Sequence, residues 1–287
     1  MKKIIIWIFF CLPIIGYSQE ENKSNSQTET NLRPVHIGLS LGLQNSVFRD
    51  LATSPLNYKG MSNNLAISRQ KTGTKKESEC RFSFSSGSFI ADFNTEIYAS
   101  DVKSAEVLYS RLYQINKNSS NGINIKLGGM INVIGNLRIN PGLQNNTLGF
   151  EVVPTGFGSV KIQKDLSRLT QKEGRFLFFN YLLSPRQKSL SCRINLGLIN
   201  AAYRNGYVYT VQGDAINKPN PFSGHSLSLF SGFRLNTAID YYIGLGNSNA
   251  IQLSYLWDGY STGGDFEPFQ MVSNTFRFTF LFSTNNQ

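Results

Sequence analysis

The chain has 287 residues, of which 40% are hydrophobic, 13% aromatic and only 16% charged, and its net charge is +10. This length allows one large domain or two small ones. Few charges beside many aromatic residues are unusual for a soluble exported enzyme. The positive charge is not accompanied by a nucleic-acid-binding motif, so we expect no nucleic-acid partner.

The first 18 residues have the pattern of a secretory signal peptide. Two lysines precede an apolar run at 4–15, and the small residues Gly16 and Ser18 follow. The run is shorter than the roughly 20 apolar residues of a transmembrane helix. We therefore expect cleavage after Ser18 and export. Residues 19–33 are polar and without periodicity, which predicts a flexible periplasmic leader.

Period-two alternation predicts β-strands from residue 34 onward, because successive side chains of a strand point to opposite faces. The clearest example is Val35–Gln44, whose outer set is apolar and whose inner set is small or polar. Residues 45–60 break the pattern and are expected to form a loop. Further strands are predicted around Leu65 and at 81–85, 89–98, 107–115, 123–133, 148–153, 176–183, 190–200, 203–211, 226–235, 239–245 and 251–257.

Two long loops interrupt these strands, at 212–223 and 258–270, and both are rich in glycine, proline, asparagine or acidic residues. We expect them outside the cell, because the outer loops of membrane barrels are long and the periplasmic turns short. The segment 160–172 fits neither period and is left open as a strand or a short surface helix.

The last strand has four phenylalanines on one face, Phe276, Phe278, Phe280 and Phe282, opposite Thr275, Arg277 and Thr279. It resembles the terminal strand of Gram-negative outer-membrane β-barrels, which ends in an aromatic residue and is read by the barrel-insertion machinery. A short tail, 283–287, departs from that pattern, since in many such proteins the aromatic residue is the last. The resemblance implies an outer-membrane location, with membrane lipid and the insertion machinery as partners.

These patterns predict an all-β fold: one closed antiparallel up-and-down transmembrane barrel over 34–282, with about 12 strands and 10 or 14 as alternatives. A soluble β-sandwich explains the small, uncharged inner faces less well. Basic residues in the loops are expected to meet the phosphates of lipopolysaccharide. Cys80 and Cys192 share faces with apolar residues, so both are expected to face lipid rather than to pair.

Charged residues on the inner faces are the candidate functional residues. A charge facing hydrocarbon costs on the order of 2–4 kcal/mol, so the barrel interpretation requires these side chains to line the lumen. They could fill the interior with ion pairs, which we favour for a small barrel, or select anions in a narrow channel. The predicted lumen-lining residues are His36, Asp92, Glu96, Lys126, Arg193, Arg234, Asp240 and Arg277.

No sequence pattern predicts a metal site or a cofactor. The alternative to a non-enzymatic channel or envelope surface protein is an outer-membrane hydrolase. His225 lies beside Ser226, and Asp258, Asp265 and Glu267 lie in the expected loop 258–270. The phospholipase family of the outer membrane places its serine two positions after the histidine. That position here is Leu227, so the match fails and a non-enzymatic role is favoured.

Overall fold

The computed structural model describes residues 34–93, 96–116, 122–143, 147–205, 225–264 and 267–284. Clustering of contacts divides the chain into residues 1–32 and 33–287, and everything described here belongs to the second unit. The predicted signal peptide, the leader and the loop 212–223 lie outside the described residues. Within that described part, no helix is long and apolar enough to cross a membrane.

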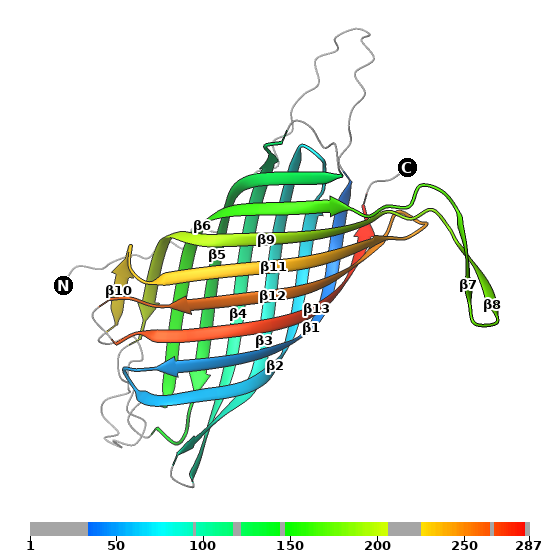
Figure 1. Ribbon diagram of the computed structural model, residues 1–287. Coiled ribbons are helices and arrows are strands. Elements are labelled where there is room, and N and C mark those ends of the chain that lie inside the picture. Colours follow the sequence, from blue (N-terminus) through cyan, green and yellow to red (C-terminus); the bar gives the residue numbers. More distant parts are fainter. Residues whose placement is uncertain are drawn as a thin grey trace. The chain divides into compact units, whose positions relative to one another are not determined.

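Ten antiparallel strands form a closed barrel (Figure 1). The ring closes through the pairing of the first strand with the last, from His36 opposite Ser283 to Asp50 opposite Phe269, and through the pairing of β6 with β9. The ten strands are β1 (Val35–Asp50), β2 (Ser54–Lys71), β3 (Lys76–Phe93), β4 (Glu96–Gln114), β5 (Ile123–Ile139), β6 (Leu148–Asp165), β9 (Lys188–Arg204), β11 (Phe233–Gly244), β12 (Ala250–Ser261) and β13 (Phe269–Ser283).

Three shorter strands complete the architecture. β7 (Lys172–Phe176) and β8 (Phe179–Leu183) form a separate hairpin between β6 and β9. β10 (Ser226–Leu229) pairs with the last part of β9, and β11 pairs with the earlier part of the same strand. β10 and β11 therefore follow one another along β9, separated by the three residues 230–232.

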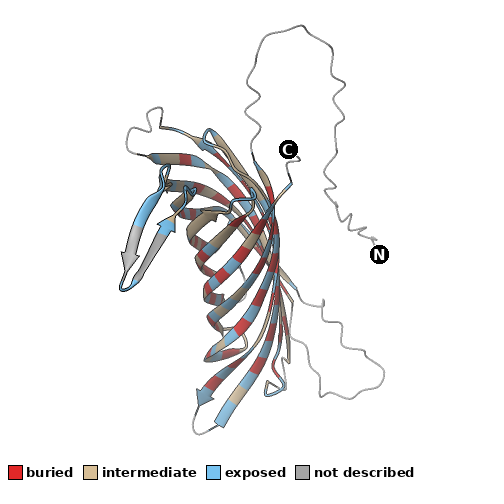
Figure 2. Ribbon diagram, turned by 90° about the vertical axis from the view of Figure 1, so that its right-hand side faces the viewer, coloured by how far each residue is buried: buried red, intermediate tan, exposed pale blue. Residues whose placement is uncertain are grey.

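The strands alternate between an exposed apolar face and a buried, mostly polar face (Figure 2). In β13, Phe276, Phe278 and Phe282 are exposed, while Thr275 and Arg277 are buried, which confirms the predicted faces of this strand. This distribution of apolar and polar side chains is the reverse of that in a soluble protein, whose apolar side chains lie inside. It is the arrangement that a lipid-facing barrel requires.

The two ends of the barrel differ in the chain segments that they carry, and they are named here the termini end and the far end. The termini end holds the first residue of β1, the last residue of β13 and the turns 72–75 and 245–249. The far end holds the turn 51–53, the last residue of β5, the first residue of β6 and the last residue of β9. The β7–β8 hairpin leaves from the termini end, so one connection there is long.

The prediction of a closed all-β antiparallel barrel is confirmed, with ten strands in the ring instead of 12. The predicted loop 45–60 is wrong, because β1 continues to Asp50 and β2 begins at Ser54. The segments expected at 81–85 and 89–98 were also divided wrongly. β3 runs unbroken through Gly87, and the turn follows Phe93. These strands have 16 to 18 residues, whereas crossing the hydrocarbon takes about 9–11. Their outer parts need not keep an apolar face.

Candidate functional site: the filled barrel interior

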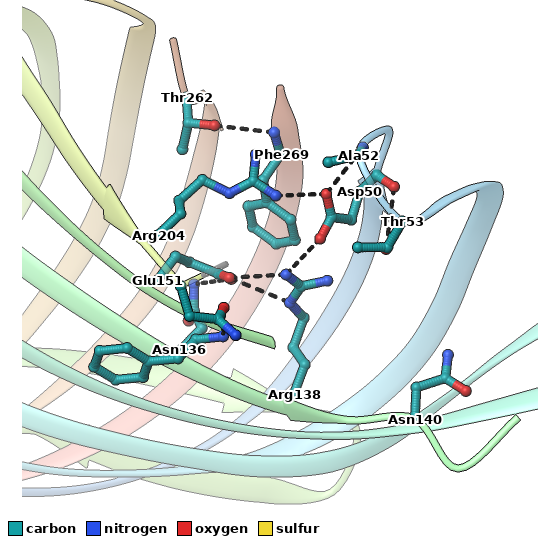
Figure 3. Close-up of polar contacts among 12 residues, drawn as sticks. Asp50, Ala52, Thr53, Asn136, Arg138, Asn140, Glu151, Arg204, Thr262 and Phe269 are labelled. Carbon is teal, nitrogen blue, oxygen red and sulfur yellow. Dashed lines mark hydrogen bonds and ion pairs between the residues drawn. The ribbon is translucent and has the colours of Figure 1, made fainter. Parts of the chain in front are cut away.

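The interior at the far end is crossed by an ion-pair network (Figure 3). Asp50, on β1, receives hydrogen bonds from the guanidinium groups of Arg138 on β5 (2.7 Å) and Arg204 on β9 (2.5 Å). Arg138 also pairs with Glu151 on β6 (2.9 Å). In the ring of ten, β5 and β9 flank β6, which lies opposite β1. Asp50 therefore joins opposite walls of the barrel.

An aromatic cluster packs around this network. Phe48 stacks on Tyr58 with ring centroids 5.0 Å apart, and it meets Phe89 edge-on at 5.4 Å. The guanidinium of Arg138 lies over the ring of Phe269 at 4.4 Å, a cation–π contact. The cluster draws its members from eight strands around the ring, β1, β2, β3, β4, β6, β9, β12 and β13: Phe48, Tyr58, Phe89, Ala91, Val102, Val153, Ala202, Tyr260, Phe269 and Met271.

The middle of the interior is polar. Arg234 pairs with Asp258 at 2.7 Å, and Arg277 donates two hydrogen bonds to the side-chain oxygen of Asn64, at 2.9 and 3.1 Å. Glu106 accepts hydrogen bonds from Ser83 and from the side-chain amide of Asn132. A cavity of about 50 Å³ lies between these groups. This level therefore keeps some open space within a charged lining.

A second set of ion pairs lies toward the termini end. Glu77 receives the ammonium groups of Lys126 and Lys161, at 2.8 and 2.5 Å. Glu79 pairs with Arg81 and Arg193, at 3.3 and 3.2 Å. The side chains come from β3, β5, β6 and β9, so these pairs also connect different walls. Charges at this depth have little water around them, and each cation has a carboxylate within contact, which limits the cost of burying it.

The structure places six of the eight sequence-predicted residues within the barrel. Lys126, Arg193 and Arg234 take part in the ion pairs above, and Arg277 bonds Asn64. Asp240, half-buried, accepts hydrogen bonds from the side chains of Gln252 and Ser254. His36 is buried at the termini end, with its Nε2 3.2 Å from the carbonyl oxygen of Ser248. The six residues therefore lie at different depths of the barrel: in the middle of the interior, toward the termini end, and at the rim of the termini end.

Asp92 and Glu96 correct the prediction, because both are exposed. On β3 the inward residues are Phe89 and Ala91, so Asp92 points outward, the reverse of the expected orientation. Glu96 lies at the far rim, where its carboxylate accepts a hydrogen bond from the Tyr98 hydroxyl at 2.7 Å. The physical reason is that the far end of the lumen is itself aromatic, so an aromatic residue such as Phe89 does not mark the lipid-facing side of β3.

The structure places Asp258, one of the acids of the hydrolase alternative, inside the barrel. Asp258 belongs to β12 rather than to a loop, and it pairs with Arg234 inside the barrel. Asp265 lies outside the described residues. The ring of His225 lies against Tyr203, with centroids 5.3 Å apart. In the described ranges, no group of three or more potential metal ligands comes together.

Cys80 and Cys192 are both free and exposed on the outer face. Cys80 lies opposite Arg69 and Tyr109, whereas Cys192 lies opposite Ile162 and Ile239. The two thiols therefore occupy separate parts of the barrel wall, as the sequence predicts.

Sequence reasoning missed the far-end network. The signal was present in the parity of the strands: Ser46, Phe48 and Asp50 continue the inward set of β1 beyond Gln44. Arg138 likewise continues the inward set of β5 that includes Lys126. Both were lost because the outward neighbours at this end are no longer uniformly apolar.

No family model matches this chain, and no curated protein matches it. Among solved structures, the transport unit of the autotransporter AIDA-I from Escherichia coli is similar with a TM-score of 0.45 and 8% identity, covering 92% of this chain and 93% of that one. The translocator domain of the autotransporter NalP from Neisseria meningitidis has a TM-score of 0.36 and 9% identity, covering 88% and 90%. The values for the β domain of the Bordetella autotransporter BrkA are 0.31 and 9%, covering 86% and 99%. Likenesses this low transfer no activity.

A closed antiparallel barrel with an apolar outer face and a polar, charged interior is the architecture of Gram-negative outer-membrane β-barrels. The chain is a barrel of this broad class.

Proposed function

We propose that this protein is an integral, non-enzymatic outer-membrane barrel with a closed interior, and that it serves as a surface or accessory protein of the envelope. The observation that carries the proposal is the bridge from Asp50 to Arg138 and Arg204. This bridge ties opposite walls together inside an aromatic cluster. A water-filled channel needs a continuous polar path, whereas this cluster places large apolar side chains across the lumen.

The location and partners belong to the same proposal. The apolar outer face of β13 supports membrane insertion by way of its terminal strand, with the barrel-insertion machinery as the partner. Lys59 and Lys103 are exposed near the far end. If the far end faces the cell exterior, these ammonium groups lie at the depth where lipopolysaccharide phosphates can accept their hydrogen bonds.

Conductance measurements test the closed interior. The purified protein is folded in detergent and reconstituted into planar bilayers, and insertion is verified separately by resistance of the band to denaturation without heating. We expect inserted wild-type protein to give no steady conductance. We expect Asp50→Ala combined with Phe48→Ala and Phe269→Ala to give discrete conductance steps, because these changes remove the bridge and two rings.

Asp101→Ala provides the matched control for Asp50, since Asp101 is exposed near the same rim, where it accepts a hydrogen bond from Ser88. This variant should remain as silent as the wild type. Steady conductance through the inserted wild-type barrel would instead establish a narrow channel and overturn the closed-interior proposal.

A further inference from the structure

The charges inside the barrel do not balance among the described residues. Eight cationic side chains face seven carboxylates. The cations are Arg81, Lys126, Arg138, Lys161, Arg193, Arg204, Arg234 and Arg277, and the carboxylates are Asp50, Glu77, Glu79, Glu106, Glu151, Asp240 and Asp258. One positive charge is therefore in excess, in a place where an uncompensated charge is costly.

Among these cations, Arg277 is the one that forms no ion pair with a carboxylate of the described residues. Arg277 is 6% exposed, and its side chain donates hydrogen bonds to the neutral oxygen of Asn64. No carboxylate of the described residues lies within ion-pair distance of it, and its Nη1 has no protein partner there. An arginine cannot shed its proton under ordinary conditions, so its burial calls for a negative partner.

Arg277 lines the cavity of about 50 Å³ in the middle of the interior. Arg81 lines the same cavity, and its Nε is also without a partner among the described residues. The hydroxyl-bearing residues Ser85, Ser104 and Thr275 contribute further potential donors. This volume exceeds the roughly 10–15 Å³ that a cavity needs in order to hold one water, so a monatomic anion with a water fits.

Two carboxylates, Glu106 and Asp258, line the cavity as well, and they would repel an anion. Each is already engaged: Glu106 accepts from Ser83 and Asn132, and Asp258 pairs with Arg234. We propose that this cavity binds one small monovalent anion of the halide class, held between Arg277 and Arg81. The bound anion gives the buried guanidinium of Arg277 the negative partner that it lacks. The proposal holds whether the barrel proves closed or conducting.

Bromide identifies the site directly. Crystals of the folded protein grown in sodium bromide, with data collected at the bromine absorption edge, should show an anomalous peak within hydrogen-bond distance of Arg277. A second measurement is the thermal unfolding midpoint at constant ionic strength. We expect it to be a few degrees higher in chloride or bromide than in gluconate, which is too large for the cavity, because a ligand that binds only the folded state stabilises it.

Asn64→Asp is the decisive variant, because it gives Arg277 a carboxylate of the same shape inside the protein. It should remove the bromide peak and make the midpoint independent of halide. Asn247→Asp makes the same chemical change in an exposed turn and should leave both effects as in the wild type. Water alone in the wild-type cavity, or an unchanged halide effect in Asn64→Asp, would overturn the proposal.

Discussion

A single carboxylate, Asp50, holds two arginines from the opposite wall of the barrel. The side chains of this triad are 4–9% exposed, so their charges interact with little screening by solvent. Removing one member of such a group leaves a buried charge without its counter-charge, which costs more than the intact group contributes. Asp50 is thus the residue at which the far end of the interior is most vulnerable.

Asp50→Asn tests that dependence while preserving the shape of the side chain. We expect a loss of about 3 kcal/mol in the free energy of unfolding, because the buried Arg138 and Arg204 both lose a carboxylate. Urea titration of the barrel in lipid vesicles, followed by the fluorescence of Trp257, measures the change. Asp101→Asn removes an exposed carboxylate and should cost much less. Equal losses in the two variants would contradict the assigned role of Asp50.

For single residues, the sequence predicts which face of a strand a side chain occupies better than it predicts which other side chain it contacts. Parity correctly indicates that Lys126, Arg193 and Arg277 sit on faces opposite to apolar residues. It gives no information on which carboxylate meets which cation. Glu77 and Lys161, for example, are 84 residues apart in the chain. Their contact depends on the stagger of strands around the closed ring, which only the three-dimensional structure fixes.

Among the elements, the junction between β10 and β11 carries backbone strain. Phe230 has φ +53° and Gly232 has φ +90°, and both lie between strands that pair with the same neighbour, β9. Positive φ is costly for a residue with a Cβ and free of that cost for glycine. A Cβ added at Gly232 would lie 2.5 Å from the carbonyl oxygen of Ser261. The break in the strand therefore depends on glycine at this position.

Gly232→Ala and Phe230→Gly separate these effects. We expect Gly232→Ala to lower the free energy of unfolding by about 1–3 kcal/mol, since strain and a clash add together. Phe230→Gly should change it by no more than about 1 kcal/mol, because relief of strain is offset by greater freedom of the unfolded chain. Urea titration in lipid vesicles compares the two. The interpretation fails if Gly232→Ala is as stable as the wild type.

The sequence predicts strands correctly where contact with lipid requires strict alternation of apolar and polar residues. It predicts them incorrectly where that requirement is absent. The terminal strand and the first part of β1 were recognised because their outward residues are uniformly apolar. The alternation does not predict the second half of β1 and the start of β2, because polar residues such as Asn45 and Lys59 interrupt the pattern. Residues 86–88 separate two predicted strands, 81–85 and 89–98, although Gly87 lies within the continuous strand β3.

For the whole molecule, whether the outer face of the barrel contacts lipid or water determines which substitutions it tolerates. Leu65 is 52% exposed near the middle of β2, and Leu229 is 61% exposed close to the far end. In a water-soluble protein, residues this exposed could be replaced by charged residues with little loss of stability. In a bilayer, the cost of a charge depends on its depth.

Leu65→Arg and Leu229→Arg therefore measure whether the barrel spans a membrane. We expect Leu65→Arg to destabilise the folded barrel by about 2–4 kcal/mol in lipid vesicles and Leu229→Arg by about 0–1 kcal/mol. The midpoints of reversible unfolding in the two variants provide the comparison. Identical small effects would indicate that the middle of the outer face lies in water.

For the whole molecule, the sequence predicts the type of fold, a closed barrel, better than it predicts the number of strands. Alternation over the whole chain predicts closure, because a lipid-exposed sheet cannot leave unpaired edges. The count of ten depends on where each strand turns, and the β7–β8 hairpin lies outside the ring, so its segment was wrongly included among the wall strands.

The seam between β1 and β13 has a consequence for biogenesis. Its fifteen paired positions join the two extremes of the described chain, from His36 opposite Ser283 to Asp50 opposite Phe269. Until the last segment has been delivered, the nascent sheet keeps two free borders of unsatisfied amide and carbonyl groups, which readily capture other chains. We therefore expect a version of the chain that ends before Phe269, and so lacks β13, to associate border to border.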